Sequence, residues 1–221
     1  MKLKKWCGFC STTFSFLPLA MKKVLFLITT ILIAMQLQAQ DVSLLNRIKA
    51  TNSKVKSFEA DLSNTLVKPK KTTSQKGKLY FVSPKEFAAL FSEDSYMIVN
   101  QSKIKMDMGL FHGIFKLKDG GMMQSLSNIF LYGFQGRIQE LADENDYSLT
   151  TKTEGNYHVV TGTNNKKSLL GIGYKQVIFK YSASDLLIKE IRLIDYGGSE
   201  DTYTVSNVKY DIPVDKKTFQ F

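Results

Sequence analysis

The sequence predicts an α+β fold, in which an antiparallel meander of short strands has one helix before it and short apolar helices within it. Three observations support this prediction. Apolar residues recur at helical spacing in residues 41–55, alternate with polar residues from Phe58 onward, and return to helical spacing in residues 119–142. A helix buries one stripe of side chains and a half-exposed strand buries every second one, so each change of period marks a change of element.

The opening helix, residues 41–55, carries its apolar residues on one face, and Asp41 or Ser43 can cap its first turn. A polar turn is expected at residues 68–76. Separators rich in Pro, Ser, Asp and Asn divide the chain beyond it into short segments, as in an antiparallel meander. The segments expected to be strands are residues 58–62, 78–82, 87–91, 96–99, 104–108, 147–153, 157–162, 176–182, 188–195, 201–210 and 219–221.

Residues 119–142 interrupt the alternation. Gly120 and Gly121 precede the apolar positions, and Gly133 and Gly136 lie among them, so short interrupted helices are expected instead of one clean helix. We find no internal repeat, linker or low-complexity stretch after residue 40. Residues 41–221 are therefore expected to form a single domain around one core.

The first 40 residues contain a signal-peptide pattern. Met21 and two lysines form a positive n-region, residues 24–35 form an apolar h-region, and Ala39 offers a cleavage site before Gln40. Residues 21–40 are expected to be a cleaved signal peptide, and residues 1–20 an upstream extension or a lengthened n-region before a true start at Met21. No cysteine follows the h-region, so a soluble exported product is expected; an uncleaved N-terminal anchor is the alternative.

The basic character of the chain does not indicate nucleic-acid binding. The formal net charge is +10, and residues 1–40 supply half of it through five lysines and no acids. The remaining excess is spread thinly, and no zinc-finger, helix-turn-helix or RNP-type motif accompanies it. A mildly basic surface suits an anionic membrane face or an acidic partner at least as well as it suits a nucleic acid.

Residues with catalytic or metal-binding chemistry are sparse. Cys7 and Cys10 form a C-x-x-C but lie in the predicted leader, and His112 and His158 belong to no cluster with metal-ligand spacing. No nucleophile elbow or P-loop is present, and the acidic pairs fall in predicted turns. The sequence therefore favours a non-enzymatic protein without metal or cofactor, although Ser and Asp are plentiful enough to leave a hydrolase open.

Several motifs resemble the LolA family of lipoprotein carriers. Residues 77–87, GKLYFVSPKEF, resemble the family signature G-x-L-x-[apolar]-x-x-P-x-x-F. Residues 55–62 are similar to the family's helix-to-strand junction, residues 98–104 to its second hairpin, and residues 215–221 to its terminal D-x-x-x-F-x-F segment. The resemblance extends over residues 44–221, and the Ala-Gln cleavage site is similar to that of Bacteroidetes proteins.

This resemblance implies a strongly curved antiparallel sheet that forms an incomplete, half-open β-barrel, with an N-terminal helix and a lid of short helices. It implies a monomeric periplasmic carrier that holds the acyl chains of lipoproteins in an apolar cavity. The carrier would receive them from an inner-membrane extraction complex and deliver them to an outer-membrane acceptor. The resemblance implies no cofactor, catalysis or nucleic acid.

The alternating rows and the resemblance together predict the site. The lipid-binding cavity is expected to be lined by Leu79, Phe81, Phe87, Ala89, Phe91, Ile104, Met106 and Met108. The lid is expected to comprise Met122, Met123, Leu126, Ile129, Phe130 and Phe134, which would plug the empty cavity. Ser83 occupies the lid-lock position, where proteobacterial relatives carry an arginine, so closure must use apolar contact or another donor.

Other interpretations remain open. The same rows are compatible with an ordinary packed core. A protein of the same fold can carry another acylated molecule, such as a glycolipid, or can recognise lipoproteins as a sensing module without transporting them. An exported hydrolase is the fourth interpretation.

Overall fold

A computed structural model describes residues 42–108, 111–118, 121–166 and 173–221. The predicted upstream extension, the signal peptide with its cleavage site, and both cysteines lie outside the described residues. A helix over residues 42–52 opens the described chain, followed by strands, the helices α2 (Met122–Gln135) and α3 (Ile138–Asn145), and further strands. The strands are β1 (Ser57–Lys68), β2 (Lys71–Val82), β3 (Glu86–Ser92), β4 (Ser95–Asn100), β5 (Lys103–Met108), β6 (Phe111–Lys116), β7 (Tyr147–Glu154), β8 (Tyr157–Asn164), β9 (Tyr174–Ser182), β10 (Ile188–Asp195) and β11 (Glu200–Tyr210).

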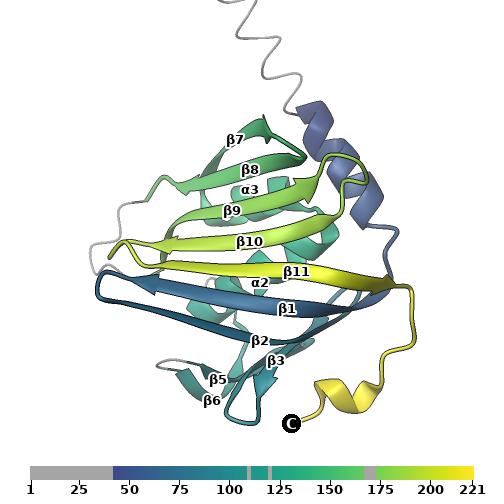
Figure 1. Cartoon of the computed structure of the whole chain (residues 1–221), viewed down its shortest axis with the longest axis vertical. Helices are drawn as coiled ribbons and strands as arrows, with labels where there is room; N and C mark the ends of the chain where they lie inside the picture. The colour runs from purple at the N-terminus through teal and green to yellow at the C-terminus, as the bar shows by residue number, and fades with distance from the viewer. Residues whose placement is uncertain (1–41, 109–110, 119–120, 167–172) are drawn as a thin grey trace, which may run out of the picture. The chain divides into compact units, whose positions relative to one another are not determined.

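All the described strands belong to one antiparallel sheet with the order β6-β5-β4-β3-β2-β1-β11-β10-β9-β8-β7. Every two consecutive strands are neighbours except β6 and β7, and at the centre β1 pairs with β11 as well as with β2 (Figure 1). β6 and β7 lie at the two ends of this order and do not pair, so the sheet is open. Residues Ser43–Phe221 form one compact unit.

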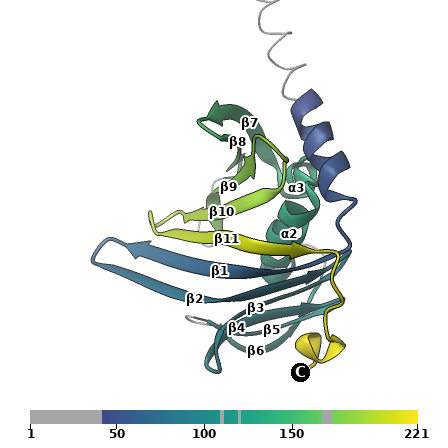
Figure 2. The same ribbon diagram turned by 45° about the vertical axis from the view of Figure 1, so that its right-hand side comes forward.

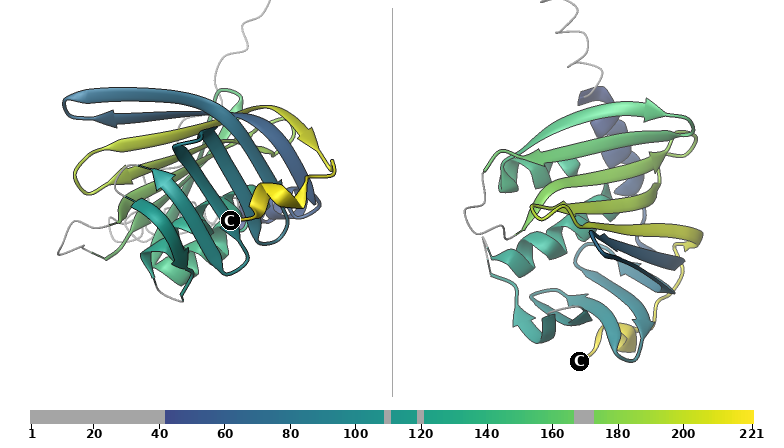
Figure 3. Two further views of the ribbon diagram at one scale, coloured as in Figure 1. Left: turned by 90° about the horizontal axis from the view of Figure 1, so that it is seen from below. Right: turned by 60° about the vertical axis from the view of Figure 1, so that its left-hand side comes forward.

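The sheet curves around α2 and α3, which lie on its concave side (Figure 2). Seen from a third direction, α2 lies between the two arms of the sheet (Figure 3). The predicted α+β fold, with its curved, incompletely closed antiparallel sheet, is therefore confirmed. In the part of the chain that the structure describes, no helix has the length and apolar character needed to cross a membrane.

An aromatic cluster fills the space between the sheet and α2. Phe134 of α2 lies edge-on to Phe58 and Phe81, with ring centroids 5.5 Å away in each case, and 5.8 Å from Phe87. Edge-to-face pairs of this kind add to the free energy gained by burial. A second, smaller cluster lies elsewhere in the fold, where Phe219 packs with Ala88 and Ile98.

Four local expectations need correction. The polar turn expected at residues 68–76 is mostly strand, because β1 and β2 continue as a long hairpin with only residues 69–70 between them. β6 was not expected. The predicted strand at residues 219–221 is absent, and a 3₁₀ helix, Lys216–Phe219, is capped by the Asp215 carboxylate instead. Gly133 does not interrupt α2, which ends at Gly136 with a left-handed φ of 67°.

Candidate functional site

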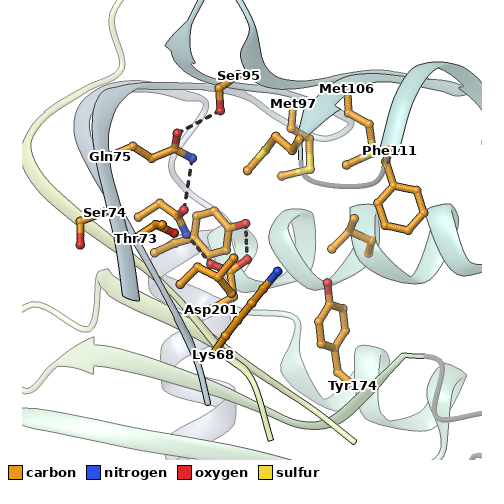
Figure 4. Close-up of a pocket in the computed structure, with 15 residues that line it drawn as sticks. Lys68, Thr73, Ser74, Gln75, Ser95, Met97, Met106, Phe111, Tyr174 and Asp201 are labelled. Atoms are coloured by element: carbon orange, nitrogen blue, oxygen red, sulfur yellow. Dashed lines mark hydrogen bonds between the residues drawn. The ribbon is translucent and has the colours of Figure 1, made fainter. Parts of the chain in front are cut away.

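A cavity of about 410 Å³ opens between the sheet and the N-terminal half of α2 (Figure 4). Its walls come from strands far apart in the chain, β1 and β2 on one side, β4, β5 and β6 on another, and β9 and β11 on a third. The lining residues are Asn64, Leu66, Lys68, Thr73, Ser74, Gln75, Ser95, Met97, Met106, Met108, Phe111, Leu126, Tyr174, Asp201 and Tyr203.

The concave face changes character along its length. Alternate residues of β1 share one face of the sheet, and in this row Phe58, Ala60 and Leu62 are buried, whereas Lys68 at the far end is exposed. Asn64 is the first polar residue of the row. Because antiparallel pairing aligns neighbouring strands, the adjacent row of β2 changes in the same way, from Phe81 and Leu79 to Gln75 and Thr73. Along β1 and β2 the concave surface is therefore apolar in its interior and mostly polar at its open end, where Leu66 is the apolar exception.

One wall of the cavity is apolar and deformable. Met97 and Met106 face each other across the β4–β5 ladder, and Met108 lies farther along the same face of β5. Phe111 and Leu126 complete this wall. Methionine side chains have three rotatable bonds and a polarisable sulfur, so they adapt to ligands of different shape. This wall suits hydrocarbon.

The opposite wall is a chain of hydrogen bonds between side chains of β1, β2, β4 and β11 (Figure 4). The Ser95 hydroxyl donates to Gln75 Oε1 at 3.0 Å, and Gln75 Nε2 donates to Asn64 Oδ1 at 3.2 Å. Asn64 Nδ2 donates to Asp201 Oδ1, and the Tyr203 hydroxyl donates to Asp201 Oδ2 at 2.8 Å. Buried polar groups are tolerated when they are bonded in this way, so the network fixes the wall's shape.

Asp201 is the acidic group of this wall. Burial raises the pKa of its carboxyl, because desolvation disfavours the charged form, and the hydrogen bonds from Asn64 and Tyr203 offset only part of that effect. Lys68 lowers the same pKa through its positive charge. Burial also raises the pKa of the Tyr203 hydroxyl well above its usual range, so this group stays a hydrogen-bond donor at physiological pH.

The C-terminal half of α2 fills the concave interior beside the cavity. Phe130 lies 5.4 Å from Phe87 and 4.9 Å from Tyr203 between ring centroids, and it borders a gap of only about 10 Å³. Gly133 allows the close approach, since a Cβ at this position would lie 2.8 Å from the Phe179 ring. At the N-terminal half, Met122 is 44% exposed and Leu126 borders the open cavity.

The C-terminal end of α2 is tied to the sheet by two hydrogen bonds. Gln135 Nε2 donates to the Pro84 carbonyl oxygen at 2.8 Å, and the buried Tyr181 hydroxyl donates to the Gly133 carbonyl oxygen at 2.8 Å. Among the described residues, the Ser83 hydroxyl has no hydrogen-bond partner; its backbone N–H donates to the Lys56 carbonyl oxygen at 2.8 Å. α2 is therefore hydrogen-bonded to Pro84, the residue after Ser83, through the side-chain amide of Gln135.

The predicted site residues are spread between the cavity and the packed interior. Met106 and Met108 line the open cavity, and Leu79, Phe87 and Ala89 border the small gap under Phe130. Phe81 and Ile104 are fully buried, while Phe91 is partly buried against the core. Among the predicted lid residues, Leu126, Ile129, Phe130 and Phe134 are buried, Met123 is half-buried and Met122 is exposed.

The polar wall was missed at the sequence level. Asn64, Gln75, Ser95 and Asp201 are separated in the chain and meet only through the strand register. A signal for Asn64 was present, because the alternation that begins Phe58, Ala60, Leu62 continues into it. The other three have no such signal.

The described residues offer little for metal or acid–base chemistry. None of them forms a group of three or more His, Cys, Asp or Glu side chains able to hold a metal ion. His112 Nδ1 lies 2.6 Å from Asp107 Oδ1, and His158 Nδ1 lies 3.1 Å from the Thr153 hydroxyl. Neither histidine lines the cavity.

Comparisons with known proteins find similarity in fold. No family model matches the chain, and no curated protein matches it. Similar solved structures include a DUF1329 family protein from Desulfovibrio piger, with 14% identity, a TM-score of 0.41, and coverage of 80% of this chain and 95% of that one. A LolA superfamily protein from Nitrosomonas europaea has 10% identity, a TM-score of 0.39, and coverage of 81% and 96%. A chain of the MucA/MucB complex of Pseudomonas aeruginosa has 11% identity, a TM-score of 0.41, and coverage of 81% and 60%.

One of the solved structures to which the chain is similar is thus a LolA superfamily protein. Seven of the similar solved structures have identities of 9–14% and TM-scores of 0.38–0.46, so their similarity carries no conclusion about a ligand or a partner.

Proposed function

We propose that this chain is a periplasmic carrier that shelters the acyl chains of lipoproteins between the concave face of its sheet and α2, and transfers them toward the outer membrane. The observation that supports this most strongly is the cavity of about 410 Å³, whose methionine-rich wall continues into the apolar interior beneath α2. Hydrocarbon is the ligand that such a wall favours, because burying apolar surface is its main source of binding free energy.

The volume of the cavity limits what it holds while α2 is in place. A group the size of a water molecule or a methylene occupies about 30 Å³, so the cavity of about 410 Å³ has room for roughly 14 such groups. That corresponds to about one acyl chain. A cargo with two or three chains therefore requires α2 to move, and Phe130 and Phe134 to leave the space they fill.

The asymmetry of α2 indicates how the lid moves. Gln135 and Gly133 tie the C-terminal end of α2 to the sheet side of the fold. The N-terminal half is instead bonded to α3, where the Ser125 hydroxyl donates to Asn145 Oδ1 at 3.0 Å and Asn128 Nδ2 donates to Glu144 Oε2 at 3.1 Å. Gly121 provides no side-chain cap, and Met122 is exposed. We therefore expect the N-terminal half of α2 to rise first, with the C-terminal end as the hinge. Hydrogen exchange with and without acylated cargo tests this. Faster exchange of residues 121–135 in the loaded protein supports it, and equal protection in both states contradicts it.

The energetic scale is compatible with a carrier that also releases its cargo. Sheltering a methylene contributes about 0.8 kcal/mol, so about 12 sheltered methylenes would contribute roughly 10 kcal/mol at most. Displacing Phe130 and Phe134 from the aromatic cluster offsets part of this gain. A lower net affinity favours transfer to an acceptor.

Native mass spectrometry of the protein purified from its own host tests the proposed cargo. Co-purified lipidated protein supports the lipoprotein carrier. A small lipid with one chain, which the present cavity volume fits, supports the second candidate, a carrier for another acylated molecule. A protein whose cavity is always empty and which hydrolyses an ester substrate contradicts both carrier functions.

A further inference from the structure

Two hydrogen-bond donors at the open end of the cavity are uncommitted. Lys68 of β1 and Tyr174 of β9 both line the cavity, and their polar ends are directed into the same space (Figure 4). Among the described residues, neither the Lys68 ammonium group nor the Tyr174 hydroxyl makes a hydrogen bond or ion pair. Lys71 lies opposite Lys68 in the register of the β1–β2 hairpin and adds a second positive charge at this end of the sheet.

The acceptors beside these donors are already used. Asp201 accepts from Asn64 through one carboxylate oxygen and from Tyr203 through the other. Asn64 Oδ1 accepts from Gln75, and Gln75 Oε1 accepts from Ser95. The open end therefore presents two spare donors and the positive charge of Lys68 to a ligand. Both Asp201 oxygens accept hydrogen bonds, and the Asp201 charge still acts on Lys68. Burial, together with that charge, raises the pKa of the Tyr174 hydroxyl.

We propose that this open end, defined by Lys68 and Tyr174, is an anion-recognition site for the headgroup of an acylated cargo, a carboxylate or a phosphate. The proposal rests on the proposed function, because the hydrocarbon of the same ligand lies against the methionine wall. An ammonium and a tyrosine hydroxyl both donate to anionic oxygens, and such charge-assisted hydrogen bonds are stronger than neutral ones. The raised pKa of the Asp201 carboxyl supports this assignment, because a buried, hydrogen-bonded acid is poorly suited to hold a cationic headgroup.

Binding of four probes with the same 12-carbon tail tests the proposal: dodecanoate, dodecyl phosphate, monododecanoylglycerol and dodecyltrimethylammonium. Each is titrated below its micelle concentration into the protein, by calorimetry or by displacement of a fluorescent fatty acid. At least one anionic probe should bind about threefold to fivefold more tightly than the neutral one, the range expected for one exposed charge pair. The preference should weaken as salt rises. Comparison of dodecanoate with dodecyl phosphate identifies which anion the site prefers.

Variants locate the preference at the two donors. Lys68→Met should bring the ratio of anionic to neutral affinity close to one while keeping the affinity for the neutral probe. Tyr174→Phe should lower the same ratio by about twofold to threefold, as expected for loss of one hydrogen bond at a partly exposed site. Lys70→Met is the matched control, since this lysine has the same charge and lies in the adjacent exposed turn outside the cavity lining. It should leave the ratio unchanged.

The outcomes separate this proposal from the proposed function. Equal affinity for anionic and neutral probes, or tighter binding of the cationic one, contradicts the headgroup site but leaves an acyl-binding cavity in place. An equal effect of Lys68→Met and Lys70→Met also contradicts it, because general charge would then account for the preference. Failure of every probe to bind contradicts the proposed function itself.

Discussion

Replacing Phe130 by alanine should lengthen the cavity toward the interior. Phe130 borders the gap of about 10 Å³, and its ring contacts Tyr203, which lines both that gap and the open cavity. Loss of a buried phenyl ring should lower the free energy of unfolding by about 3–5 kcal/mol. If about three further methylenes of a ligand enter the vacated space, they contribute roughly 2.4 kcal/mol, which is a gain in affinity of about fiftyfold.

A series of saturated fatty acids from 10 to 18 carbons measures this change by calorimetry. In the unmodified protein the affinity should rise with chain length and level off near about 14 carbons, where the volume of about 410 Å³ is filled. In Phe130→Ala the plateau should move to chains about three carbons longer. The reasoning is refuted if the variant is folded and the plateau stays where it was.

Phe219→Ala is the matched control, because Phe219 is 2% exposed and packs in the separate cluster with Ala88 and Ile98. It should destabilise the protein comparably and leave the chain-length profile unchanged. Phe130→Leu, a smaller truncation, keeps the test possible if the alanine variant does not fold. Its plateau should move in the same direction by less.

Two further predictions concern the lid and the polar wall. Gln135→Leu leaves the Pro84 carbonyl oxygen without its donor, so it should lower the free energy of unfolding by about 1–3 kcal/mol and speed hydrogen exchange in α2. The control Gln139→Leu, on the exposed face of α3, should change neither the stability nor the exchange rate. The raised pKa of the Asp201 carboxyl in the folded protein means that its ionisation lowers the stability of the unmodified protein as pH rises from below 3.8 toward 7. Asp201→Asn has no such ionisation, so its stability relative to the unmodified protein should increase over the same pH range. Urea unfolding across this pH range measures the difference, whose pH-dependent part should disappear in acid. An advantage that is the same at all pH values would contradict this assignment.

Much of the fold could be predicted because alternation and helical spacing report burial directly. The rows starting at Phe58 and Leu79 are on the concave face as their periodicity indicates, and residues 122–135 are helical. The β1–β2 hairpin was predicted too short, because its end is exposed on both faces. Such a segment lacks the apolar alternation by which strands are recognised, although Thr72 and Thr73 favour extended backbone.

The site could be predicted only in part. Met106 and Met108, expected in the cavity, lie along its wall, and so does Leu126, which was expected in the lid. That these residues bind lipid stays a prediction. The polar wall could not be predicted, since Asn64 and Asp201 are 137 residues apart and meet through the β1–β11 pairing. The hydrogen bond that ties α2 beside Ser83 was also invisible in the sequence, because Gln135 reaches Pro84 across 51 residues.

The central claim is that an acyl chain lies between the concave face and α2. Photocrosslinking with a palmitic acid that carries a diazirine along its tail, followed by peptide mapping, tests this most directly. Saturable crosslinks to Met97, Met106 and Leu126 are expected, and an excess of unlabelled palmitate should remove them. Crosslinks confined to the cluster around Phe219, or labelling that competition does not reduce, would contradict it.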